Sequence, residues 1–427
     1  MGKWKPHYYR VGPASAELDA PPEKTEGHRK NIEPWLSAVF QSEHLSLLVG
    51  SGLPSAIAAI SKTKPIDMQM VKFNCDLEDK VNESAKESAK KCERGAPNFE
   101  DQMRAALTLL EGLELLRDSR ATAWQKAINE ALSKFLLAVL ESEGELRTAF
   151  EAESVAGQNG SHALSSFLMS FASRTATRER LNLFTTNYDR LLEYGCDLIG
   201  LRTIDRFVGA LSPEFRSSRL DIDLHYNPPG IRGEPRFLEG VVKLTKLHGS
   251  VDWHYSGQKL WRSNVRFGAG SGHPDLPKNP LHSVMIYPNP AKDVETSQYP
   301  YAELFRDFSA AICRPNSAIV TYGYGFGDDH INRIIRDALT IPSTHLVIIS
   351  FDEASGRIPG FCDKLGREAQ TSLLMGSHFG DLSTLVNNYL PKAAIDQITG
   401  RRTDLLKRRG EIPTSTSDPV GTDGDPR

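Results

Sequence analysis

The sequence predicts an α/β fold: a Rossmann-like, mostly parallel sheet with helices on both faces, plus an inserted helical subdomain. Short continuous apolar runs such as LSLLVG and HLVIISF are typical of strands that are covered on both faces of a parallel sheet. These runs alternate with amphipathic segments of helical length, as βαβ crossovers require. One long stretch interrupts the alternation with purely helical spacing, which indicates the insertion.

The first segment of the chain shows no clear hydrophobic periodicity. Residues 1–28 are rich in Pro, Glu and Lys, so we expect an N-terminal arm there. Residues 29–76 then show a helix, the strand LSLLVG, a GSG turn and the helix PSAIAAI. We assign this segment to the first part of the sheet domain.

Residues 77–150 show helical periodicity without an obvious strand. Apolar side chains recur every three or four positions, at Phe99, Met103, Leu107, Leu110 and Leu113, and again at Trp124, Ile128, Leu132, Phe135 and Val139. We therefore predict an inserted subdomain of amphipathic helices.

The α/β alternation resumes over residues 151–395. Strands are expected at LNLFTT, VVKLTKLH, SVMIYP, SAIVTYGYG and HLVIISF, and helices at HALSSFLMSF, NYDRLLEYGCDLI, AELFRDFSAAI, DDHINRIIRDAL and FGDLSTLVNNYL. Residues 396–427 end in Ser, Thr, Pro, Gly and Asp, a composition that predicts a disordered C-terminal tail.

Composition narrows the class of protein. A net charge of −3 does not suit a nucleic-acid coat, so nucleic acid is expected to be reached only indirectly, through a partner or the patch GRRTDLLKRRG. No apolar run approaches the roughly 20 residues of a membrane span, and the first residues lack the apolar core of a signal peptide. The five cysteines are scattered and include no C-x-x-C pair, which favours reduced thiols in the cytoplasm and no zinc site.

Ligands of open α/β sheets bind beyond the carboxyl ends of the strands, and four such places carry glycine or polar residues. The first is Gly50-Ser51-Gly52, with Ser55 close behind. Its glycines permit a tight turn at a helix N-terminus, where backbone N–H groups bind phosphate. The alternative is an ordinary turn between a strand and a helix.

The second place is TTNYD, from Thr185 to Asp189. The amide of Asn187 is suited to holding a water molecule or a ribose hydroxyl. Alternatively, Thr186 or Asn187 caps the next helix, and Asp189 favours its dipole.

The third and fourth places follow later strands. His248-Gly249 ends a strand and leads into a polar, aromatic turn with Trp253 and His254; His248 is either an acid–base group or a structural histidine. In TYGYGFGDDH, glycines allow a ligand close to the backbone. Asp328 or Asp329 there either caps a helix or meets a ribose hydroxyl.

Five motifs occur in the order found in sirtuin-like domains: LLVGSGLPSA, LFTTNYDRLLE, KLHGSVDWHY, MIYPNPAK and TYGYGFGDDHI. Together they resemble the bacterial sirtuin-like NAD hydrolases of antiphage defence more closely than the histone deacylases. The resemblance covers roughly residues 35–75 and 160–355. It implies that NAD is the substrate.

The resemblance also implies roles by position. Asn187, Asp189 and His248 match the catalytic positions, with Asn187 near the nicotinamide ribose and Asp189 its companion. The expected NAD-binding positions are Gly50, Ser51, Gly52, Ser55, Thr186, Gly323, Tyr324 and Gly325. Deacylating sirtuins carry two zinc-binding C-x-x-C pairs after this histidine, whereas residues 254–300 here contain no cysteine. That departure favours water as the nucleophile and argues against a zinc module.

We therefore expect an NAD⁺ hydrolase that releases nicotinamide and ADP-ribose. The alternatives are a module that senses NAD or ADP-ribose without consuming it, and an NAD-dependent protein deacylase. The resemblance further implies control by homo-oligomerisation or by a partner such as a HerA-like hexameric ATPase. This chain contains no G-x-x-x-x-G-K-[ST] motif, so an ATPase would be a separate protein. The insertion or the arm is expected at subunit contacts.

Overall fold

The main sheet is mixed but mostly parallel. In the computed structural model it contains nine strands among the described residues, in the order β2-β1-β16-β15-β14-β3-β4-β10-β5. The structure describes residues 5–22, 25–66, 68–91, 95–218, 223–226, 236–256, 259–270, 272–276, 283–285 and 299–392. The strands are β1 (His7–Val11), β2 (Ala14–Leu18), β3 (His44–Val49), β4 (Leu181–Thr185), β5 (Arg202–Ile204), β10 (Val241–Lys246), β14 (Ser317–Tyr322), β15 (His345–Ser350) and β16 (Thr371–Met375).

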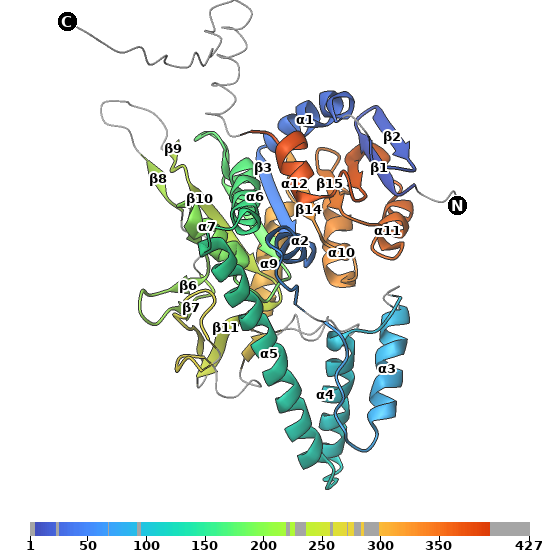
Figure 1. The fold of residues 1–427 in the computed structure, drawn as a ribbon, viewed down its shortest axis with the longest axis vertical. Helices are drawn as coiled ribbons and strands as arrows, with labels where there is room; N and C mark the ends of the chain where they lie inside the picture. Colours follow the sequence, from blue (N-terminus) through green and yellow to red (C-terminus); the bar gives the residue numbers. More distant parts are fainter. Residues whose placement is uncertain are drawn as a thin grey trace, which may run out of the picture. The chain divides into compact units, whose positions relative to one another are not determined.

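Helices cover both faces of this sheet, which confirms the predicted fold class (Figure 1). On β3, Leu45, Leu47 and Val49 belong to one core cluster and Leu48 to the other, as the two-residue period of a strand requires. The first cluster includes side chains from α1 (Glu26–Phe40), α2 (Gly52–Ser61), α6 (Val155–Ala172), α7 (Leu191–Leu198), α12 (Leu382–Thr384) and the adjoining π-helical turn (Leu385–Tyr389). The second includes side chains from α9 (Tyr301–Ile312), α10 (Asp329–Ala338) and α11 (Arg357–Leu365).

Part of the segment expected as an N-terminal arm, residues 7–18, forms two strands of the main sheet. Strand β1 pairs antiparallel with β16, Tyr9 opposite Leu374, and β2 pairs with β1 as the outermost strand. Tyr8, Tyr9 and Val11 are buried. Strands this short, interrupted by charged residues, lack the apolar run that marks the central strands. Strand β16 and α11 were not predicted either.

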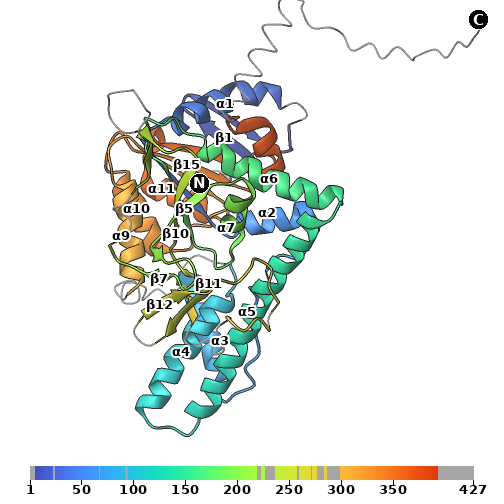
Figure 2. The same ribbon diagram turned by 90° about the vertical axis from the view of Figure 1, so that its left-hand side faces the viewer.

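The insertion consists of α3 (Glu78–Lys91), α4 (Phe99–Leu115) and α5 (Ala121–Glu151). Helices α4 and α5 lie side by side and extend away from the sheet (Figures 1 and 2). Helix α4 begins with a capping box, in which the side chains of Asn98 and Asp101 each accept a hydrogen bond from the other's backbone N–H. The predicted apolar positions of both helices are buried, except for Leu107, which is partly buried.

A second, five-stranded antiparallel sheet lies among the described residues after α7. One of its strands, β13, lies in the predicted strand SVMIYP, and another, β11, occupies the place after His248 where a turn was expected. It has the order β13-β11-β12-β7-β6. The strands are β6 (Phe207–Val208), β7 (Glu214–Phe215), β11 (Gly249–Ser256), β12 (Lys259–Arg262) and β13 (Ser283–Met285). The residues after His248 therefore form a strand, and Trp253 packs in the core against Phe207. A separate two-stranded ribbon pairs β8 (His225–Tyr226) with β9 (Arg236–Phe237).

Some expectations lie outside the described residues. They concern the end of SVMIYP, the segment PNPAK, the tail at 396–427 and the patch GRRTDLLKRRG. Among the helices that the structure describes, none is long and apolar enough to cross a membrane.

Candidate functional site

The candidate site lies where the order of the parallel strands reverses. From β3 the chain builds the sheet in one direction through β4 and β10, and later in the other through β14, β15 and β16. Strands β3 and β14 are neighbours, with Val49 opposite Tyr322. The turns beyond their carboxyl ends lead into α2 and α10, and open α/β sheets bind their ligands in the crevice at such a switch point.

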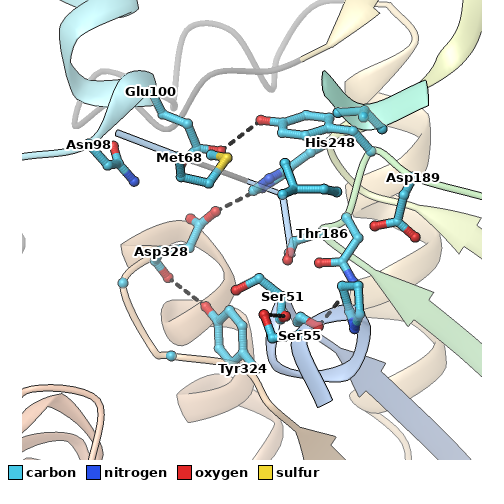
Figure 3. A pocket seen from close by; sticks show the side chains of 18 of the residues that line it. Ser51, Ser55, Met68, Asn98, Glu100, Thr186, Asp189, His248, Tyr324 and Asp328 are labelled. Carbon is cyan, nitrogen blue, oxygen red and sulfur yellow. Dashed lines mark hydrogen bonds and ion pairs between the residues drawn. The ribbon is translucent and has the colours of Figure 1, made fainter. Parts of the chain in front are cut away.

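A cavity of about 320 Å³ occupies this crevice. Most of the predicted site residues line it: Gly50, Ser51, Ser55, Thr186, Asn187, Asp189, His248, Tyr324 and Gly325. Figure 3 shows the side chains around it. The two remaining predicted residues, Gly52 and Gly323, line an adjoining cavity of about 490 Å³. The structure thus brings together residues from four separate strand ends.

Asn187 is held by its neighbours. Its backbone N–H donates to Thr185 Oγ1 at 3.0 Å, and its side-chain Nδ2 donates to the Gly50 carbonyl at 3.0 Å. It does not cap α7, because that helix begins at Leu191, after Arg190 as the N-cap residue. The amide therefore bridges two strand ends at the cavity wall.

Asp189 supports the helix that follows. Its Oδ1 accepts a hydrogen bond from the Leu191 N–H at 3.0 Å. Burial raises the pKa of Asp189, while the nearby Lys246 ammonium acts in the opposite direction. Asp189 thus has the alternative role that was considered for it, which is to support the N-terminus of a helix.

His248 is buried and paired. Its Nε2 lies 2.9 Å from Asp328 Oδ2, and both side chains line the cavity (Figure 3). The other oxygen of Asp328 accepts from the His330 N–H at 3.2 Å, as the cap of α10. Asp328 therefore caps a helix and orients the imidazole at once. The sequence suggested only the cap or a ribose contact, because nothing in it links two residues 80 positions apart.

The glycine turns pack against each other. The N–H groups of Gly50 and Gly52 donate to the carbonyls of Tyr322 and Gly323, both at 3.0 Å. A Cβ on Gly52 would lie 2.5 Å from the Gly323 Cα. These two N–H groups therefore donate hydrogen bonds within the protein, and the NAD-binding role of the turn stays a prediction. Contact between the two turns is one reason for glycine here.

Arg357 stands between the two cavities and lines both. It is the first residue of α11, and its Nε donates to the Gly325 carbonyl at 2.6 Å. The second cavity continues beyond β15 to Ser350, Phe351 and Asp352. Sequence analysis missed Arg357, since α11 itself was not predicted.

The helical insertion closes the first cavity from the other side. The insertion contributes Asn98, Glu100, Phe135, Val139 and Ser142, and the segment that precedes it contributes Ile66 and Met68. The Tyr188 hydroxyl donates to Glu100 Oε1 at 2.9 Å, which joins the TTNYD segment to α4. None of these residues was predicted for the site, because helical periodicity shows a buried face without showing what it faces.

Comparison with known families bears on this arrangement. Residues 181–369 match the SIR2-like domain. The matched range includes Asn187, His248, Asp328 and the turn at Gly323, while Gly50 and the insertion precede it. SIR2-like domains are typically NAD-dependent enzymes, so the match indicates NAD-related chemistry. No curated protein matches the chain.

Metal binding has no support in the described ranges. They contain no group of three or more His, Cys, Asp or Glu side chains placed to hold a metal ion. The absence of a zinc module stays a prediction from the cysteine-free stretch 254–300, part of which is not described.

Proposed function

We propose that this protein binds NAD⁺ in the two adjoining cavities and hydrolyses the nicotinamide–ribose bond, releasing nicotinamide and ADP-ribose. The observation that carries the proposal is the meeting of Asn187 and His248 in one cavity at the switch point of the sheet. The SIR2-like match over residues 181–369 supports NAD as the substrate.

The charges of the lining residues support one orientation of the dinucleotide. The first cavity is lined by the acidic residues Glu100, Asp189 and Asp328 and, at its junction with the second, by Arg357. NAD⁺ carries a cationic nicotinamide at one end and an anionic diphosphate in its middle. The nicotinamide ribose would then lie by His248, the diphosphate by Arg357 and the adenosine in the second cavity.

The mechanism follows from the side chains that meet there. Positive charge builds on the ribose as its bond to nicotinamide breaks. Asn187 already donates from Nδ2 to the Gly50 carbonyl, and its side-chain oxygen is the atom suited to orient the attacking water. His248, oriented by Asp328, binds or deprotonates a ribose hydroxyl. Acid–base work of this kind contributes about 10²–10⁴-fold in rate.

The test is a product assay on purified protein with NAD⁺. We expect His248→Ala and Asn187→Ala to lose nicotinamide release by a factor of about 10² or more while keeping the wild-type melting curve. His254→Ala is the matched control, because His254 lies on β11 and does not line the cavity. Full turnover in either cavity variant would remove that residue from the mechanism.

The same assay separates the alternative functions. NAD⁺ binding without nicotinamide release by the wild type would replace hydrolysis with sensing. Nicotinamide release that depends on an added acetyl-lysine peptide would replace it with deacylation.

The biological setting is also part of the proposal. The resemblance to antiphage NAD hydrolases supports a role in defence against phage, in which the enzyme depletes NAD in the bacterial cytoplasm. Such an enzyme must be restrained until it is needed, which favours a homo-oligomer and a HerA-like ATPase partner. A stable monomer in light scattering at micromolar concentration would contradict the oligomer.

A further inference from the structure

Glu100 brings a carboxylate into the cavity from outside the sheet domain. It is the second residue of α4, and the start of that helix is fixed by the Asn98–Asp101 capping box. The neighbouring Phe99 stacks on Phe135 of α5 with ring centroids 4.7 Å apart. A carboxylate in a first helical turn is favoured by the partial positive charge of the helix N-terminus. Glu100 is thus held on a rigid support.

Tyr188 connects Glu100 to the proposed reaction centre. Its hydroxyl donates to Glu100 Oε1 at 2.9 Å, and its ring centroid lies 6.4 Å from that of His248. Tyr188 stands between Asn187 and Asp189 in the chain, so one short segment carries the amide and also positions the carboxylate. Glu100 and His248 are both among the side chains that line the cavity (Figure 3).

The other acidic residues of the lining have different tasks. Asp328 pairs with His248 and caps α10. Asp189 accepts from the Leu191 N–H, and its backbone carbonyl accepts from the Lys246 ammonium. Glu100 alone among the three acids that line the cavity comes from the helical insertion.

We infer that Glu100 is a specificity-determining residue that recognises the positive charge of the oxidised nicotinamide ring. The inference rests on the proposed function, because it takes the nicotinamide to lie at the His248 end of the cavity. NAD⁺ carries a charge on this ring and NADH does not. Because Glu100 is buried, its carboxylate attracts the cationic ring of NAD⁺ more strongly than the neutral ring of NADH.

Binding measurements test this without relying on turnover. The full-length protein is titrated by calorimetry with three ligands: a carbocyclic NAD⁺ analogue, whose nicotinamide bond does not hydrolyse, NADH and ADP-ribose. We expect Glu100→Gln to weaken binding of the cationic analogue about tenfold and to leave NADH and ADP-ribose within about twofold. Tyr188→Phe, which removes the hydroxyl that positions Glu100, should give a smaller loss in the same direction.

Glu114→Gln is the matched control, since Glu114 is an exposed residue of the same helix and should not change any of the three affinities. An equal change for all three ligands in Glu100→Gln, or no change, overturns the inference and leaves the proposed function intact. If the wild type binds none of the ligands, the proposed function falls and the inference with it. Melting curves of each variant show whether a loss reflects unfolding.

Discussion

At the scale of single residues, the site depends on side chains that serve structure and chemistry together. Asp328 caps α10 with one oxygen and orients His248 with the other. Asn187 ties its own strand end to the Gly50 carbonyl and still lines the cavity. A sequence motif does not show whether one side chain has two roles. Sequence analysis therefore treated helix capping and a catalytic amide as alternatives for Asn187.

The glycine pair makes a prediction at this scale. Gly323 has a φ of +59°, and a Cβ there would lie 2.6 Å from the Gly52 Cα, a backbone atom that cannot swing aside. We expect Gly323→Ala to lower the free energy of unfolding by about 2–4 kcal/mol, measured by urea denaturation.

Gly325→Ala is the control for that experiment. A Cβ there would meet Arg357 Nη2 at 3.1 Å, the end of a flexible side chain. Its cost should stay below about 1 kcal/mol. Equal losses in the two variants would show that contact between the turns is not what requires glycine at position 323.

At the scale of elements, the helical insertion is fastened to the sheet domain by a buried ion pair. Glu143 of α5 accepts from the Arg190 backbone N–H at 2.8 Å and pairs with the Arg190 guanidinium. Arg190 directly follows Asp189, so α5 is anchored beside the predicted catalytic segment. Amphipathic spacing predicted the helices. It did not predict the role of Glu143, because its partner Arg190 lies far away in the chain.

Removal of one charge from this pair should be costly. Glu143→Gln leaves the buried Arg190 guanidinium without its counter-charge, and we expect a loss of about 3 kcal/mol in the free energy of unfolding. Glu141→Gln, at an exposed position of the same helix, should change it by less than about 0.5 kcal/mol. Similar values for both variants would mean that the pair does not stabilise the junction.

At the scale of the whole molecule, His345 makes one contribution to the pH dependence of stability. Burial lowers the pKa of His345 to about 4. Ser372 Oγ lies 2.8 Å from the ring Nε2 and also accepts from the Trp35 indole at 2.8 Å. The neutral imidazole is therefore the form that stabilises the contact between β15, β16 and α1.

The direction of the effect follows from linkage. The unfolded chain binds a proton at His345 near pH 6.5, whereas the folded protein binds it only near pH 4. The stability that comes from the neutral ring is thus fully present above pH 6.5 and is lost as pH falls toward 4. We expect wild type to lose about 2 kcal/mol more than His345→Gln across this window, measured by urea denaturation at each pH. Parallel curves for the two proteins would assign the acid loss to other groups.

The sequence by itself determined the fold class, the central strands and the helices of the insertion, because continuous apolar runs and helical spacing are local patterns. It also placed most of the predicted site residues correctly at the first cavity, since ligands of such sheets bind beyond the strand ends. Only the tertiary structure decided that β1 and β2 join the sheet, that Asp328 pairs with His248 and that Glu100 closes the cavity. Those features depend on contacts between residues far apart in the chain. Local composition does not indicate which distant residues a side chain contacts.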